Sequence, residues 1–242
     1  MPQYPRMLPL GDAGFLVEFG DSIDPAVNDR VVNFAQAVER SRVPGVIEVV
    51  PAYRSAAIYV DPVEKDLVSL REAFMTLAVN FPMEPVGRQH AVAIPVLYGG
   101  EAGPDLPALA ERAGLSMEQV IELHASVEYR VFMLGFSPGF PYLGIVPDAI
   151  AAPRLPEPRI NVPAGSVGIA GRQTGIYPQA SPGGWRLIGR TPLTLYDPAR
   201  IRPFLLEPGD LVRFVSIDRE EFDRLKEKKD DDKNDRPELR SG

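Results

Sequence analysis

The sequence predicts an α+β protein in which a small α+β domain is followed by a β-barrel domain. Strand-like and helix-like patterns alternate in the first third of the chain. Between Gly135 and Pro198, ten glycines and eleven prolines fall within 64 residues, about a third of the stretch, where roughly 12% would be ordinary. Aromatic and aliphatic residues run through the same stretch, whereas disordered chains lack them. Short strands joined by tight turns, as in a compact barrel, are therefore expected there.

The first domain begins with a strand followed by a helix. Phe15–Phe19 has the pattern of a strand, and Asp24 before Pro25 predicts the start of the helix. Two more strands are predicted at Val46–Val50 and Ala56–Val60.

A second Asp-Pro pair, Asp61-Pro62, predicts the start of a second helix, and His90–Val96 predicts a further strand. The helix carries apolar residues at helical spacing, namely Leu67, Leu70, Phe74 and Leu77. The resulting order of strands and helices favours a sandwich of the split-βαβ type. The two prolines of Phe81–Pro85 disfavour a continued helix, so this segment is predicted to be a linker.

We accordingly place the first domain at residues 1–84 and the barrel domain at residues 85–218. In the barrel domain, Ser116 and Gln119 predict a capping box at the start of a helix that carries His124. Short strands are predicted at 167–170, 185–188, 193–196 and 211–217. Residues 219–242 are expected to form a short helix and a disordered charged tail, since their end is almost free of apolar residues.

Composition narrows the classes of partner. The chain of 242 residues has a formal net charge of −7 and no cysteine. The acidic balance argues against nucleic acid or an anionic membrane as the main partner. The lack of cysteine excludes disulfides and thiolate chemistry. We expect a soluble cytoplasmic protein, because neither a signal-peptide pattern nor a membrane-spanning apolar run is apparent.

Gly135–Gly139 matches the G-x-S-x-G pattern of a hydrolase nucleophile, with Ser137 at its centre. That motif uses the backbone N–H of the residue after the serine as an oxyanion donor, and here the next residue is Pro138, which has none. The histidines also precede the serine, opposite to the order of the hydrolase triad. We therefore interpret Ser137 as part of a rigid loop that shapes a pocket.

His124 lies on the apolar side of its predicted helix, where it is either a packed core residue or a general base. Gly165–Gly175 also permits two interpretations, although it fails the spacing of a phosphate loop. Its glycines either supply positive φ angles at a barrel turn or form a nest of backbone donors beside Arg172 that binds a carboxylate or phosphate.

Trp185 is the single tryptophan and follows Gly183 and Gly184. The glycines indicate a turn that brings backbone close to a ligand or partner, with Trp185 as a platform. Alternatively, Trp185 closes one end of the barrel. Arg154 and Arg159 flank a nearby proline-rich connection.

Long stretches of the sequence resemble the family of 5-oxoprolinase B subunits. They are PGVIEVVPAYRS (44–55), YGGEAGPDL (98–106), FMLGFSPGFPYLG (132–144), residues 153–193 and PGDLVRF (208–214). The same family includes the sporulation-kinase inhibitor KipI and the allophanate hydrolase subunit 1-type domain of urea carboxylases. The resemblance implies a ferredoxin-like first domain and a cyclophilin-like barrel.

It also implies that the protein acts with two further 5-oxoprolinase components, a C subunit of the allophanate hydrolase subunit 2-type and a separate A subunit. Together such proteins open 5-oxo-L-proline to L-glutamate at the expense of ATP. Two alternatives come from the other branches: a regulatory protein that inhibits a histidine kinase, and a carboxyltransferase component that works with biotin. The chain lacks a recognisable ATP motif, so ATP is expected to bind elsewhere in the complex, and no metal site of its own is expected.

The chemistry suggests roles for particular residues. A lactam amide is a poor electrophile. Phosphorylation of its oxygen turns that oxygen into a leaving group and activates the carbonyl carbon, after which water can attack. The site needs a base for water and cationic or N–H donors for the anions. We therefore expect His124 and Arg172 to be catalytic, and the substrate-binding residues to be Arg159, Gly165, Ser166, Gly168, Gly171, Gln173 and Trp185.

Overall fold

The computed structural model describes residues 3–61, 63, 66–86 and 91–228. The chain divides into two compact units, Met1–Val86 and Gly87–Gly242. Within the described residues, no helix is both long and apolar enough to cross a membrane.

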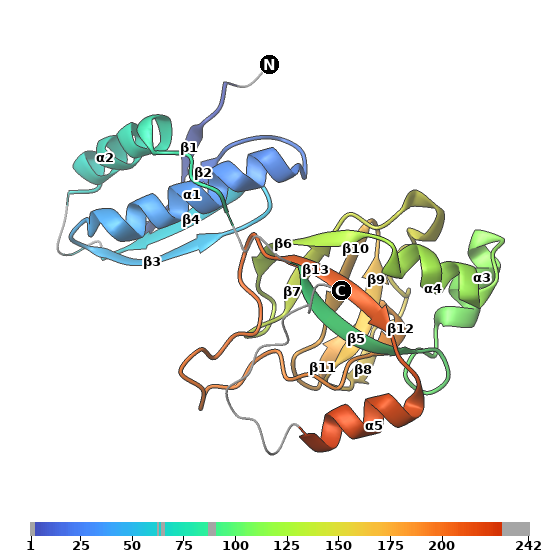
Figure 1. Cartoon of the computed structure of the whole chain (residues 1–242). Coiled ribbons are helices and arrows are strands. Elements are labelled where there is room, and N and C mark those ends of the chain that lie inside the picture. The colour runs from blue at the N-terminus through green and yellow to red at the C-terminus, as the bar shows by residue number, and fades with distance from the viewer. Residues whose placement is uncertain (1–2, 62, 64–65, 87–90, 229–242) are drawn as a thin grey trace. The chain divides into compact units, whose positions relative to one another are not determined.

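The first unit contains one antiparallel sheet with the strand order β1-β2-β4-β3. Two helices pack against one face of this sheet, and apolar side chains of both layers form the core of the unit (Figure 1). The elements are β1 (Arg6–Pro9), β2 (Gly14–Glu18), α1 (Pro25–Ser41), β3 (Val46–Pro51), β4 (Ser55–Val60) and α2 (Leu67–Asn80).

The two helix starts test the predicted Asp-Pro signals. At α1 the prediction is confirmed, because the Asp24 carboxylate accepts hydrogen bonds from the first backbone N–H groups and Pro25 opens the helix. At α2 it is wrong: the N-cap is Asp66, which accepts from the amides of Val68 and Ser69. Asp61 instead accepts from the amide of Val63, so its side chain stabilises a local turn.

The last strand of the predicted split-βαβ order, His90–Val96, follows the predicted domain boundary at residue 84, and its described part belongs to the second unit. His90 lies outside the described residues, and β5 (Val92–Tyr98) is a strand of the barrel. The place beside β2 is taken by β1, with Met7 opposite Val17. The split-βαβ order is therefore wrong in its final strand, and the ferredoxin-like assignment stays a prediction.

The predicted barrel is confirmed. It closes in the order β10-β7-β6-β13-β5-β12-β9, and β5 and β13 run side by side in parallel (Figure 1). The cyclophilin-like type stays a prediction. The bounds are β6 (Glu128–Leu134), β7 (Pro141–Gly144), β9 (Ser166–Ala170), β10 (Gln173–Ile176), β12 (Arg186–Arg190) and β13 (Leu211–Ser216).

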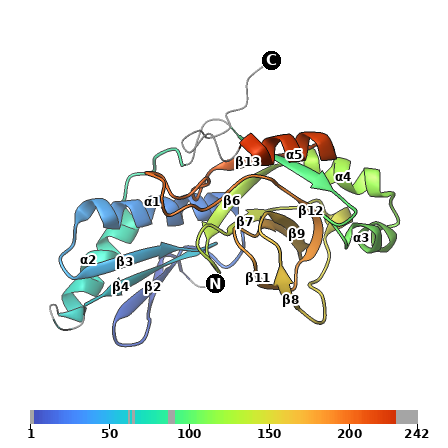
Figure 2. The same ribbon diagram turned by 90° about the horizontal axis from the view of Figure 1, so that it is seen from below.

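Helices and a two-stranded ribbon complete the second unit. The ribbon consists of β8 (Arg159–Val162) and β11 (Ser181–Gly183). Two of the helices, α3 and α4, lie together against the barrel (Figure 2). The helical elements are α3 (Leu106–Ala113), α4 (Met117–Ala125), the 3₁₀ turn η1 (Asp148–Ile150) and α5 (Arg219–Lys228).

Most local predictions in this unit are confirmed. Ser116 and Gln119 form the capping box of α4, and α5 is the expected short helix. The predicted strand at 193–196 is wrong, since the segment is irregular apart from an isolated bridge between Tyr196 and Phe204. The predicted disordered tail lies largely outside the described residues, which end at 228.

Candidate functional site

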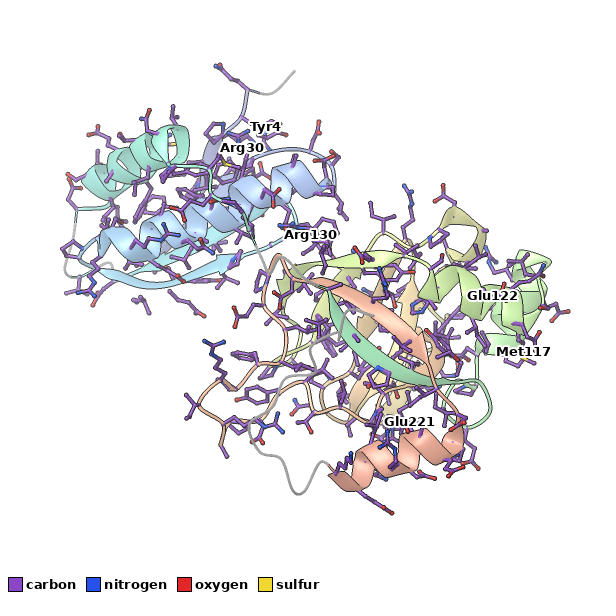
Figure 3. All side chains as sticks on the ribbon, in the orientation of Figure 1. Tyr4, Arg30, Met117, Glu122, Arg130 and Glu221 are labelled. Atoms are coloured by element: carbon purple, nitrogen blue, oxygen red, sulfur yellow. The ribbon has the colours of Figure 1, made fainter. Side chains whose placement is uncertain are left out.

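His124 is completely buried on the inner side of α4, whereas Met117 and Glu122 of the same helix are exposed (Figure 3). Its Nδ1 lies 2.8 Å from the Tyr98 hydroxyl, and its Nε2 lies 3.0 Å from Thr174 Oγ1. The imidazole stacks on Phe214 at a centroid distance of 4.5 Å. The ring is therefore held on both edges and one face.

The hydrogen-bond chain determines the tautomer of His124. Thr174 donates its single hydroxyl proton to the carbonyl oxygen of Gly168 at 3.0 Å, so it must accept from Nε2–H, and Nδ1 accepts from Tyr98. Burial lowers the pKa of His124 from 6.5 to about 3, so the ring is neutral at physiological pH. A general base must reach the proton it removes. This geometry supports the packed-core interpretation.

Gly165–Gly171 comprises β9 and the residues at its two ends. β9 pairs with β10 on one side and β12 on the other. At the ends, Gly165 N–H donates to Tyr177 at 2.7 Å and Gly171 N–H donates to Ala152 at 2.6 Å. Ser166 is buried, and its amide donates to Pro163. These three donors are used within the second unit, which favours the barrel-turn interpretation of the glycines over the donor nest.

Arg172 lies at the turn between β9 and β10, far from Gly165. The length of β9, about 17 Å for five residues, separates the two. Arg172 forms an ion pair with Asp148 at 2.8 Å, and the side chains are 62% and 79% exposed. Gln173, which begins β10, is at the same end. The structure therefore divides the predicted site between the two ends of one hairpin.

The outer wall of the barrel has a row of residues with glycines at its centre. Tyr142, Gly175, Gly168 and Leu187 are in register across four strands. Thr174 points into the barrel, so its neighbour Gly175 faces outward. A Cβ at Gly175 would lie 3.0 Å from the Phe140 ring, and one at Gly168 would lie 3.0 Å from the Cβ of Trp185. The predicted substrate-binding glycine Gly168 thus makes room for Trp185.

Four rings pack over these glycines, and we call them the outer-wall aromatic cluster: Phe140, Tyr142, Tyr177 and Trp185. Phe140 meets Tyr177 and Trp185 edge to face, with centroids 5.1 and 5.4 Å apart. Trp185 is only 4% exposed, and its Cβ lies next to Gly168 on the outer wall, which favours packing on the barrel wall over closing an end of the barrel.

Two arginines adjoin the outer-wall aromatic cluster. Arg154 lies over the Trp185 ring, 6.0 Å from its centroid. Arg159 is opposite Gly183 in the ribbon, and its Nη2 donates to Asp105 Oδ1 at 2.7 Å. Two predicted substrate-binding residues, Arg159 and Trp185, thus lie near the backbone segment Gly183–Trp185, and their role in binding stays a prediction. Tyr142, Tyr177 and Phe140 were missed.

Ser137 lies in the loop that joins β6 to β7, so no helix follows it. Its Oγ is buried without a hydrogen-bond partner among the described residues, and the two nitrogens of His124 bind other groups. The neighbouring Phe136 is 65% exposed with φ = 64°. With Phe204, the loop lines an open cleft of about 350 Å³. The interpretation of Ser137 as a residue of a pocket-shaping loop fits this geometry.

Comparison with known proteins places the chain in a family. The family described as "Carboxyltransferase domain, subdomain C and D" matches residues 5–206. The B subunit of 5-oxoprolinase from Bacillus subtilis (strain 168) is 43% identical, over 90% of this chain and 95% of that protein. The B subunit of 5-oxoprolinase from Escherichia coli O157:H7 is 45% identical, over 88% and 96%.

Solved structures show the same fold. TTHA0988 superimposes with a TM-score of 0.76 at 43% identity, over 85% of this chain, which spans only 40% of that longer chain. The Kluyveromyces lactis urea carboxylase has a TM-score of 0.75 at 22% identity, over 93% of this chain and 23% of its own length. From the matched residues and the identities, the chain belongs to the carboxyltransferase domain family of subdomains C and D and, within it, to the branch of 5-oxoprolinase B subunits.

Proposed function

We propose that this protein is the B subunit of an ATP-dependent 5-oxoprolinase that opens 5-oxo-L-proline to L-glutamate together with the A and C subunits of that enzyme. The observation that carries the proposal is the 43–45% identity to proteins named as 5-oxoprolinase B subunits along almost their whole lengths. Matches over 88–90% of this chain must extend into both compact units.

The chemistry assigns this chain a binding role within the complex. Opening the lactam requires phosphorylation of its oxygen by ATP before water attacks, so the developing charge must be met by cations and N–H donors. Arg154, Arg159 and Arg172 are the cations at the candidate sites. The ion pair of Arg172 is largely exposed, so it is weak and leaves the guanidinium available to another anion. We place ATP in the assembled complex.

Activity measurements with purified proteins test this proposal. We expect ATP-dependent formation of glutamate from 5-oxoproline only when this chain is mixed with candidate A and C subunits. Arg172→Ala should lower the rate at least tenfold if Arg172 contacts a reacting anion. Arg213→Ala, which removes an exposed arginine paired with Glu128, is the matched control. An assembled but inactive mixture would refute the proposal and favour the regulatory alternative.

The same assay tests the role of Ser137. Ser137→Ala removes a hydroxyl that makes no hydrogen bond within the described structure, so we expect the rate of the complex to stay within about twofold of the wild type. A nucleophile would behave differently, since its loss removes a covalent step worth several orders of magnitude. A thousandfold loss with intact assembly would therefore show that Ser137 reacts.

A further inference from the structure

The β8–β11 ribbon contains two buried polar atoms that lack partners among the described residues. They are Arg159 Nη1 and Ser181 Oγ. A buried donor without an acceptor costs free energy, so an atom of this kind calls for an explanation. Arg159 Nη1 is the more informative of the two atoms, because a hydrogen bond to Asp105 fixes the orientation of its guanidinium group.

Asp105 holds Arg159 in place. One carboxylate oxygen accepts from Arg159 Nη2 at 2.7 Å, and the other accepts from the backbone N–H of Leu187 at 2.6 Å. The Asp105 side chain is 12% exposed and the Arg159 side chain 29% exposed. Both carboxylate oxygens of Asp105 thus accept hydrogen bonds, and Asp105 orients the guanidinium of Arg159. The N–H groups of Arg159 Nη1 have no acceptor among the described residues.

The second arginine approaches the same backbone segment, Gly183–Trp185. Arg154 lies over the Trp185 ring, and the next residue, Leu155, donates its N–H to the carbonyl oxygen of Gly184 at 2.7 Å. Arg159 is opposite Gly183 in the ribbon. Arg154 and Arg159, which flank the proline-rich connection, therefore both lie near the segment Gly183–Trp185.

The Tyr177 hydroxyl lies next to the same segment, since a Cβ on Gly183 would overlap it. Burial raises the pKa of Tyr177, while the backbone N–H of Trp185 and the positive charges of Arg154 and Arg159 act in the opposite direction. Both cations therefore act on one hydroxyl at the edge of the outer-wall aromatic cluster. A positive potential beside aromatic surface suits a small ligand that combines an anionic group with a compact ring.

We propose that Arg154 and Arg159 bind the oxyanion group of a small ligand at the edge of Tyr177 and Trp185. Nη1 of Arg159 supplies the unused donor, and Arg154 closes over the ligand from the exposed side. The choice of 5-oxoproline or ATP as the source of the oxyanion, a carboxylate or a phosphate, rests on the proposed function. The anion site itself rests on the unpartnered Nη1 of Arg159 and on the positions of Arg154 and Tyr177.

Trp185 provides the measurement, because it is the only tryptophan of the chain. We would titrate the full chain with 5-oxo-L-proline, ATP and orthophosphate in turn and follow tryptophan fluorescence. At least one should produce a saturable change. Arg154→Gln and Arg159→Gln should each weaken this binding about tenfold or more, as expected for a charge-assisted hydrogen bond. Arg213→Gln, on another part of the barrel, should bind like the wild type.

The outcomes separate this inference from the proposed function. Saturation by 5-oxoproline identifies the carboxylate as the ligand group, and saturation by ATP or orthophosphate alone identifies a phosphate; either supports the anion site. No saturable change with any of the three, or equal affinity in Arg154→Gln, overturns it. Arg154 is exposed, so this variant remains informative even if Arg159→Gln unfolds. Binding without activity in the reconstituted complex would refute only the proposed function.

Discussion

Lowering the pH from 6.5 towards 3 is expected to reduce the free energy of unfolding by up to about 1.4 kcal/mol per pH unit through His124 alone. The pKa of His124 is about 3 in the folded protein because of complete burial, while the unfolded chain titrates near 6.5. The unfolded state therefore takes up the proton first. The stabilising contribution is fully present above pH 6.5 and is lost as the pH falls towards 3.

A His124→Gln variant isolates this effect from the titration of carboxylates. Urea denaturation of both proteins between pH 7.5 and 4 gives the difference in unfolding free energy at each pH. The variant should be less stable at pH 7.5, and its disadvantage should shrink as the pH falls, because only the wild type takes up a proton at position 124 when it unfolds. A constant difference over the whole range would show that His124 titrates normally in the folded state.

The second large effect concerns the two glycines that flank β9. Gly165 has φ = 82°, and a Cβ there would overlap the carbonyl oxygen of Thr191. Two backbone hydrogen bonds restrain Gly165, since its N–H donates to the carbonyl oxygen of Tyr177 and its carbonyl oxygen accepts from the N–H of Thr191. We expect Gly165→Ala to lower the unfolding free energy by about 3 kcal/mol or more, because the left-handed backbone and the overlap both oppose the side chain.

Gly171→Ala is the matched control. Gly171 has φ = 61°, but a Cβ there would meet nothing within 4 Å. Only the backbone term remains, so the expected loss is about 1 kcal/mol. Urea denaturation of the two variants and the wild type measures both losses. Equal losses would mean that the strand moves away from Thr191 at little cost and that packing at Gly165 is not tight.

The parts of the fold that depend on neighbouring residues could be predicted. The caps at Asp24 and Ser116 depend on a side chain and the next few backbone N–H groups, so a short pattern contains the whole interaction. The helix start predicted at Asp61 was wrong for a related reason. Its carboxylate has the same short reach, but a turn with Val63 is an equally good use of it.

Strand pairing could not be predicted in the same way. Val92–Tyr98 has the pattern of a strand in any sheet, and its partners were decided by β12 and β13, which come much later in the chain. The outer-wall aromatic cluster was missed for the same reason. Tyr142 meets Trp185 because β10 and β9 place Gly175 and Gly168 between their strands, and no short pattern records that register.

The parallel pairing of β5 with β13 has a consequence for synthesis on the ribosome. Val92 is opposite Val212, so the first strand of the barrel emerges about 120 residues before its neighbour. The barrel therefore stays open until β13 has been translated, and closing so long a separation favours slow folding. The first unit has no such delay, because its core is drawn from residues between Met7 and Phe81. It can complete its core while translation of the barrel is still under way.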